Sequence, residues 1–182
     1  DLVLAYFVDD DLLDSANYKY RDTVTKHAQY TKTGYDVTPW QNEPDTMPSN
    51  NVSATCQTSI KVSDVTFKYY NQTVISVISA EYGTSIASII PVREGHTFVL
   101  ASGSPEMVGE VDIDVFGEFV ANKHAINVTV TDVDSSTTLV IIDNVAYGSS
   151  VADTVNAYLN EHRPLGSGYH YEVEASGTMP RS

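Results

Sequence analysis

The sequence predicts an α+β protein in which three small modules of strand and helix order ββαββ follow one another. Tyr20, Tyr82 and Tyr147 recur about one small domain apart, which is typical of an internal repeat. After each tyrosine a short segment leads to a glycine followed by an aromatic residue, where a new strand is expected. We therefore interpret the three tyrosines as equivalent core or edge-packing residues. The predicted modules are residues 1–62, 63–124 and 125–182.

The first module shows the expected elements in order. Residues 2–8 are β-rich, an acidic turn follows, and residues 12–20 return as a second strand, so the pattern predicts a hairpin. Asp22 and Thr23 favour the start of a short helical turn. A third strand is expected at residues 33–37, and an alternating fourth strand is expected at residues 52–58.

The second and third modules repeat this order. A hairpin is expected over residues 65–82 and another over residues 127–146. The crossover at residues 85–90 is short, whereas Ser150 and Asp153 form a capping pair for a longer, plainly amphipathic helix. Pro91 and Pro164 are expected to end the two crossovers. The second module closes with strands at residues 96–101 and 111–115.

The third module runs out of residues before its fourth strand. Its methionine loop, Gly177 to Pro180, is followed only by Arg181 and Ser182. A missing strand leaves an open edge of unpaired backbone groups. Three outcomes stay open at this point: the natural chain continues and supplies the strand, another subunit donates one, or the module folds without it.

Composition excludes several classes of protein. The 24 acidic and 10 basic residues among 182 give a formal net charge of −14, which argues against nucleic acid and against anionic membrane surfaces. No apolar run approaches the length of a membrane span, so no membrane insertion is expected. Cys56 is the only cysteine, so it forms no intrachain disulfide and is expected in the core. The start at Asp1 indicates a processed protein or an excised fragment.

Catalytic and metal-binding patterns are absent from the sequence. No nucleophile elbow, phosphate loop or Cys-His pairing occurs, so we expect no enzyme and no cofactor. Asp132 and Asp134 look like the start of a calcium loop, but the glycine and glutamate that such a loop needs are missing. The five histidines are scattered, and no metal site is expected.

Exposed aromatic side chains and sequons supply the candidate binding and modification sites. Trp40 follows a proline beside a polar loop, where an exposed ring can stack on a sugar or anchor a partner, although packing in its own module's core is the simpler interpretation. The strand of Tyr169 and Tyr171 in the divergent third module is the second candidate. Three sequons mark candidate glycosylation sites at Asn51, Asn71 and Asn127.

The first two modules resemble the Listeria–Bacteroides repeat, the internalin B-type β-grasp module. The resemblance rests on Tyr6-Phe7-Val8-Asp9, Thr33-Gly34-Tyr35, Trp40, Pro44-Asp45-Thr46-Met47-Pro48, Phe67-Lys68-Tyr69-Tyr70, Glu81-Tyr82-Gly83 and Arg93-Glu94-Gly95-His96-Thr97-Phe98. The sequence departs from the family at Arg21, where glycine is usual, and at Ala101 or Ser102, which stand in the place of Trp40. The third module is looser and resembles the mucin-binding-type β-grasp modules.

The resemblance implies a non-enzymatic tandem protein of the bacterial cell surface or of a phage virion. We therefore expect an extracellular structural spacer or stalk in a surface or fibre assembly. The alternatives are an adhesin module that binds a host glycan or surface protein, a phage virion decoration or fibre domain, and an accessory module of a larger enzyme. The expected partners are neighbouring repeats of the same or a longer chain, and like subunits through an open strand edge.

Overall fold

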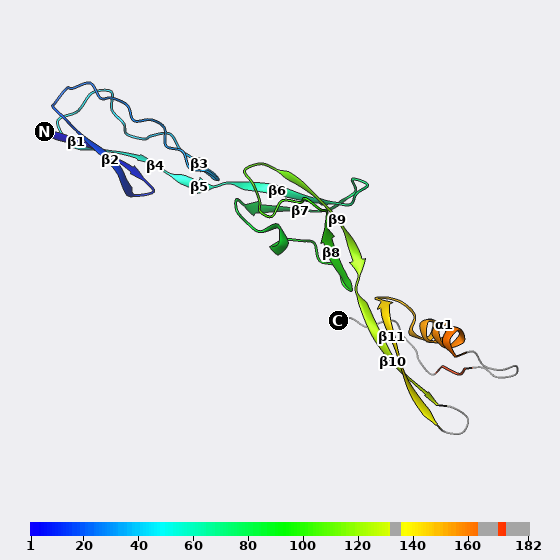
Figure 1. Cartoon of the computed structure of the whole chain (residues 1–182). Coiled ribbons are helices and arrows are strands. Elements are labelled where there is room, and N and C mark those ends of the chain that lie inside the picture. The colour runs from blue at the N-terminus through cyan, green and yellow to red at the C-terminus, as the bar shows by residue number, and fades with distance from the viewer. Residues whose placement is uncertain (132–135, 164–170, 174–182) are drawn as a thin grey trace. The chain divides into compact units, whose positions relative to one another are not determined.

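The computed structural model describes residues 1–131, 136–163 and 171–173. It is mostly β, with 50% of the described residues in strands or bridges and 9% in helical elements; Figure 1 shows the arrangement. The strands of the first half are β1 (Leu2–Val8), β2 (Asp11–Tyr18), β3 (Tyr35–Val37), β4 (Val52–Cys56), β5 (Thr58–Ile60), β6 (Val62–Lys68) and β7 (Val74–Glu81). The rest are a 3₁₀ turn η1 (Ile86–Ser88), β8 (His96–Leu100), β9 (Ile113–Ala121), β10 (Lys123–Thr131), β11 (Thr137–Ala146) and α1 (Val151–His162).

The predicted α+β class with three ββαββ modules is wrong, because the described residues hold one α-helix and four small sheets. Between Tyr20 and β3 the chain forms no helix, and between Tyr82 and β8 it forms only η1. Ser85, which precedes η1, makes no side-chain capping hydrogen bond. Thr23, Val24 and Thr25 favour extended backbone, and a segment this short does not offset the cost of starting a helix.

The first sheet has the strand order β2-β1-β4. β1 and β2 form the predicted antiparallel hairpin, with Leu2 opposite Tyr18, and β4 runs parallel to β1. Fully buried side chains alternate with more exposed ones along β1 and β4, so one face of the sheet is buried. The core under this sheet contains Leu4, Tyr6, Val24, Met47 and Ala54. Cys56 is also buried, as predicted, and burial raises the pKa of its thiol.

The other sheets follow along the chain. β3 and β5 pair as a short antiparallel ribbon, and one sheet has the order β7-β6-β9-β8. A single residue, Lys61, separates β5 from β6, and Asn122 separates β9 from β10. In each of these two pairs, the second strand therefore begins almost directly after the first ends.

By their contacts the residues divide into two compact units. Unit 1 comprises Asp1–Phe67, Ser76–Ile89 and Pro105–Val115, and unit 2 comprises Lys68–Ile75, Ile90–Ser104 and Phe116–Ser182. Both units take residues from the predicted module 63–124. The module boundaries near residues 62 and 124 stay a prediction.

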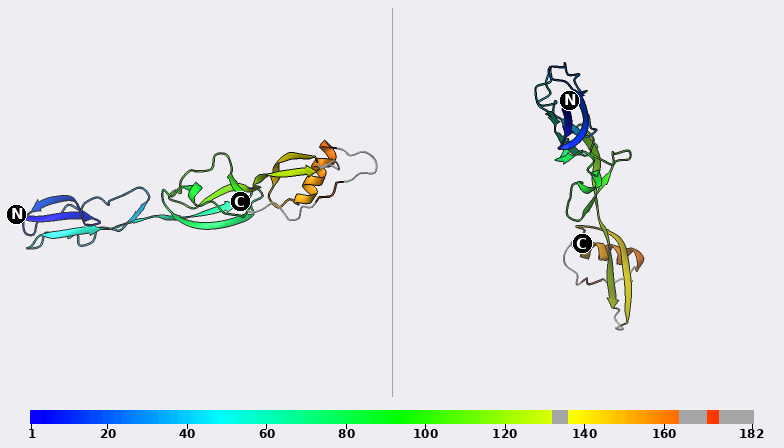
Figure 2. Two further views of the ribbon diagram at one scale, coloured as in Figure 1. Left: turned by 90° about the horizontal axis from the view of Figure 1, so that it is seen from below. Right: turned by 90° about the vertical axis from the view of Figure 1, so that its left-hand side faces the viewer.

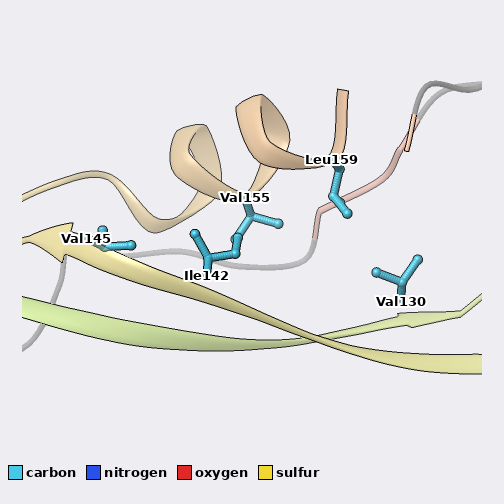
Figure 3. Close-up of a cluster of buried hydrophobic side chains, with 5 residues drawn as sticks. All are labelled: Val130, Ile142, Val145, Val155 and Leu159. Atoms are coloured by element: carbon cyan, nitrogen blue, oxygen red, sulfur yellow. The ribbon is translucent and has the colours of Figure 1, made fainter. Parts of the chain in front are cut away.

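The predicted helix of the last third is present and packs on a hairpin. β10 and β11 pair antiparallel, and α1 lies beside β11 in both views of Figure 2. Ser150 is the N-cap residue, and its side chain accepts a hydrogen bond from the Asp153 N–H, as the sequence predicts. Figure 3 shows the buried cluster between helix and hairpin, which contains Val130, Ile142, Val145, Val155 and Leu159.

Leu159→Ala should destabilise this cluster by about 3 kcal/mol, because it leaves a cavity under α1 where the side chain is almost fully buried. Leu139→Ala is the matched control, since Leu139 is 65% exposed on β11 and its loss should cost less than about 0.5 kcal/mol. Urea unfolding followed by circular dichroism measures both changes. Equal losses for the two variants would show that the helix does not seal this core.

The missing fourth strand of the third module cannot be compared with the fold, because residues 174–182 lie outside the described part of the chain. Within the described residues, no helix is both long enough and apolar enough to cross a membrane.

Candidate functional site

Two junctions in which a tyrosine ring covers a glycine are the most specific constellations in the structure. The first junction consists of Gly34, Lys61 and Tyr82. Gly34 is buried and has a φ of 78°, a left-handed conformation that residues with a Cβ rarely adopt. A Cβ at this position would lie closer than 3.0 Å to three ring carbons of Tyr82. The ring therefore lies directly against the glycine backbone, and only glycine leaves room for it.

Backbone hydrogen bonds hold the tyrosine in this place. The Lys61 N–H donates to the Gly34 carbonyl over 2.9 Å, and the Tyr82 N–H donates to the Lys61 carbonyl over 2.8 Å. Lys61 thus connects the glycine turn before β3 to the end of β7. Because both bonds use backbone groups of one linking residue, they fix the linker itself and not only its side chain.

A carboxylate adds charge to the first junction. Glu110 accepts a hydrogen bond from the Gly34 N–H at 2.9 Å and pairs with the Lys61 ammonium at 2.8 Å. The Lys61 side chain, followed by the Gly34 N–H, holds the pKa of Glu110 below its usual range, and Glu110 raises the pKa of Lys61. Both side chains are partly exposed, so this ion pair contributes little on its own.

The second junction repeats the first with Gly95, Asn122 and Tyr147. Gly95 has a φ of 67°, and a Cβ there would lie closer than 3.0 Å to three ring carbons of Tyr147. The Asn122 N–H donates to the Gly95 carbonyl, and the Tyr147 N–H donates to the Asn122 carbonyl, both over 2.8 Å. The same three positions therefore make the same contacts, although lysine and asparagine differ as linking residues.

The loop behind each tyrosine also repeats. The Arg21 N–H donates to the Met47 carbonyl and the Gly83 N–H donates to the Val108 carbonyl, both over 2.9 Å. Val108 thus occupies the place of Met47, although the neighbouring Met107 is the methionine of this loop.

The tyrosines are equivalent in backbone but differ in burial. Tyr82 and Tyr147 are half-buried, whereas Tyr20 is 56% exposed, so the interpretation of Tyr20 as a packed residue is wrong. The reason is that the covering glycine comes from a different segment of the chain. The Gly-aromatic pairs were visible in the sequence, but nothing in the sequence connected them to the tyrosines.

Trp40 lies at the edge of the core under the first sheet. Its ring is half-buried, packs edge-on against Tyr6 with ring centres 5.1 Å apart, and donates from Nε1 to the Ala28 carbonyl at 2.9 Å. Glu43 accepts from the Tyr6 hydroxyl at 2.8 Å and from the His27 N–H at 2.7 Å. Burial first, and then Glu43, raises the pKa of Tyr6. Trp40 is thus held by its own module, and its role in binding a ligand stays a prediction.

The other predicted site residues are placed as follows. The Tyr171 hydroxyl donates to the Arg163 carbonyl, and its ring packs against the cluster under α1, while Tyr169 lies outside the described residues. Asn51, Asn71 and Asn127 are all exposed. The Asn51 side chain accepts from the Val3 N–H at 2.8 Å, the Asn71 side chain accepts from the Thr73 N–H at 3.1 Å in a turn, and Asn127 lies on β10.

An open groove of about 440 Å³ lies next to the first junction in unit 1. The Lys32 ammonium lies over the Tyr35 ring there, 3.8 Å from its centre. The described residues hold no group of three or more histidine, cysteine or acidic side chains arranged to bind a metal ion. The groove is lined by Gln29, Tyr30, Thr31, Lys32, Thr33, Tyr35, Asp36, Val37, Lys61 and Glu110.

Comparison with known proteins leaves the family open: no protein-family model matches the chain, and no curated protein is significantly similar to it. The resemblance to the Listeria–Bacteroides repeat therefore stays a prediction.

Gly34→Ala should destabilise the protein more than Gly83→Ala. Both glycines have nearly the same positive φ, 78° and 81°, so each alanine costs about 1–2 kcal/mol in backbone strain. Nothing lies within 4 Å of a Cβ on Gly83, whereas a Cβ on Gly34 meets the Tyr82 ring, which adds about 1–3 kcal/mol of overpacking. Urea denaturation measures the difference, and equal losses would contradict a packed junction.

Acid should weaken the first junction through Glu110. Because the pKa of Glu110 is lowered in the folded protein, its contribution is fully present above the usual value of 4.5 and is lost as the pH falls through the lowered value. Wild type should therefore be more stable than Glu110→Gln at neutral pH, and the difference should shrink as the pH falls below 4.5 and disappear below the lowered pKa.

The amide resonance of Gly34 provides a local reading of the same event. It should titrate at acidic pH in the wild type and stay constant in Glu110→Gln. A resonance that titrates equally in both proteins would assign the effect to another group.

Proposed function

We propose that the chain is a non-enzymatic extracellular repeat protein that acts as a spacer or stalk in a surface or fibre assembly. The single observation that carries this proposal is the repetition of the junction. Gly34, Lys61 and Tyr82 make the same hydrogen bonds and ring contact as Gly95, Asn122 and Tyr147. Because the same set of contacts stabilises two separate connections of the chain, we infer that holding these connections fixed is part of its function.

The junctions oppose the motion that a tandem protein otherwise shows. Segments joined by a short linker move relative to one another unless a contact beyond the linker holds them. Here the linking residue is bonded on both sides, and a ring is packed against a glycine next to it. Within each unit the elements on either side of the linking residue are thus held in one arrangement.

The extracellular setting rests on the sequence. The resemblance to tandem modules of bacterial cell-surface or phage virion proteins supports it, as do three sequons whose asparagines are exposed. The net charge of −14 supports a protein that stays soluble and resists sideways association in a crowded layer. The assembly partners in this proposal are neighbouring modules of the same or a longer chain.

A second candidate function is adhesion to a host glycan or surface protein. The open groove beside the first junction favours it, because Tyr30, Tyr35 and Lys32 offer two aromatic rings and a cation to a polar ligand. Screening the chain on a glycan array and against host surface proteins tests this function. Binding that is lost in Tyr35→Ala would support it, and the absence of any ligand leaves the spacer function alone.

Tyr82→Ala should allow the two sides of the first junction to move independently. In the wild type, ¹⁵N relaxation should give β1 and residues 76–81 the same correlation time, because the ring and both hydrogen bonds connect them. Without the ring the two groups should tumble with different correlation times. Tyr70→Ala is the control, because this substitution removes a ring of equal size from a position that is 59% exposed.

Chemical-shift dispersion in both halves of Tyr82→Ala shows whether the variant stays folded. Unchanged relaxation in a folded Tyr82→Ala protein would refute a stiffening role for the junction.

A further inference from the structure

Tyr20 has the backbone setting of a junction tyrosine, but no glycine among the described residues covers its ring. We propose that Tyr20 is the docking site for the glycine turn of a further module of the same kind, joined to this chain through the residue that precedes Asp1. The proposal rests on the proposed spacer function and names the partner that the exposed tyrosine takes.

The backbone around Tyr20 matches that around Tyr82. The residue after each tyrosine is left-handed, with a φ of 68° at Arg21 and 81° at Gly83. The Val24 N–H donates to the Asp45 carbonyl at 3.0 Å, and the Ile86 N–H donates to the Glu106 carbonyl at 2.9 Å. The two tyrosines therefore start from the same position relative to the loop that supports them.

Strand register places the linking residue opposite Tyr20. In β10 and β11, Lys123 pairs with Ala146, and one step further Asn122 accepts from the Tyr147 N–H. In β1 and β2, Leu2 pairs with Tyr18, so two steps further Tyr20 stands opposite the residue before Asp1.

A second pair of hydrogen bonds gives the same alignment. The Val3 N–H donates to the Asn51 side chain and the Asp64 N–H donates to the Asp112 side chain, both over 2.8 Å. This match places Asp1 at the position of Val62. The residue before Asp1 thus takes the place of Lys61, and a module joined through it brings its glycine turn to Tyr20.

The two filled junctions show which group can pack on the exposed ring of Tyr20. Tyr20 is 56% exposed, with the Arg21 guanidinium 5.0 Å from the ring centre, whereas the equivalent rings of Tyr82 and Tyr147 are half-buried. In both filled junctions a Cβ on the covering residue would collide with the ring, so the partner must present a glycine with positive φ. It must also offer that glycine's carbonyl to the linking residue.

A duplication recreates the missing half of the site. A second copy of residues 1–61, fused directly before Asp1, places the copy's Lys61 in the linking position and the copy's Gly34 opposite Tyr20. The copy carries Tyr20→Phe, so that the measurement reports only on the Tyr20 of the original chain. A second fusion carries Gly34→Ala in the copy as well. The added Cβ should keep the Tyr20 ring from packing there, because a Cβ on Gly34 clashes with the Tyr82 ring in the first junction.

Nitration by tetranitromethane, followed by mass spectrometry, measures the accessibility of Tyr20. Its rate should fall about tenfold or more in the fusion, as expected for a ring packed in a stable contact. It should stay near the rate of the unfused chain when the copy carries Gly34→Ala. Tyr70, which is 59% exposed and lies outside any junction, should react at the same rate in all three proteins.

Amide hydrogen exchange of Tyr20 is a second reading that does not depend on the alanine variant. The Tyr20 N–H should become protected in the fusion, because the copy's Lys61 carbonyl accepts from it as Lys61 accepts from Tyr82. Unchanged nitration and exchange of Tyr20 in the fusion would overturn the proposal. Protection of Tyr20 in the unfused chain that grows with concentration would also overturn it, in favour of a second copy of this chain as the partner.

The outcome is separable from the proposed function. Independent motion in Tyr82→Ala tests whether a junction stiffens the chain, and Tyr20 plays no part in that measurement. A Tyr20 that stays exposed in the fusion, together with a Tyr82→Ala that loosens unit 1, would refute only the docking site. A protected Tyr20 with unchanged motion in Tyr82→Ala would refute only the stiffening role.

Discussion

The close approach of a tyrosine ring to a glycine backbone is the contact on which the connections of this chain depend. Covering one aromatic ring contributes about 1.5–3 kcal/mol when burial is complete, and these rings are half-buried. Each backbone hydrogen bond of the linking residue adds about 1 kcal/mol, and an exposed pair such as Lys61 and Glu110 adds less. The ring and the two backbone bonds therefore outweigh the charge, so a lysine at one junction and an asparagine at the other serve equally.

The sequence correctly predicted the elements whose formation depends on neighbouring residues in the chain. The hairpin of β1 and β2 followed from two apolar runs around an acidic turn, and α1 followed from its amphipathic period and the Ser150 cap. The helix expected after Tyr20 does not form, because a segment rich in threonine and valine is held instead by backbone hydrogen bonds to the loop of Asp45 and Met47. That loop lies far along the chain, so no local signal could show that it would compete with a helix.

The sequence showed the two sets of residues that form the candidate site, but not that they contact each other. The Gly-aromatic pairs at Gly34 and Gly95 and the tyrosines at Tyr82 and Tyr147 each repeat, but repetition shows equivalence and not contact. Pairing them requires the strand register that brings Lys61 or Asn122 between them. For the same reason Tyr20 looked equal to Tyr82, although burial depends on a partner segment that sequence similarity does not supply. Trp40 was ambiguous because its packing depends on Tyr6 and His27.

The junction is a head-to-tail contact, and this determines how it can be used. A glycine turn on one side meets a tyrosine on the other, so the two surfaces are different and neither can pair with itself. A contact of this kind does not pair two copies as a two-fold interface does, and its repetition gives a ring or an open row. The docking site that we propose at Tyr20 uses a contact of this head-to-tail kind. The net charge of −14 opposes sideways pairing of copies, so it agrees with the proposed addition of modules at Tyr20 and not with lateral association.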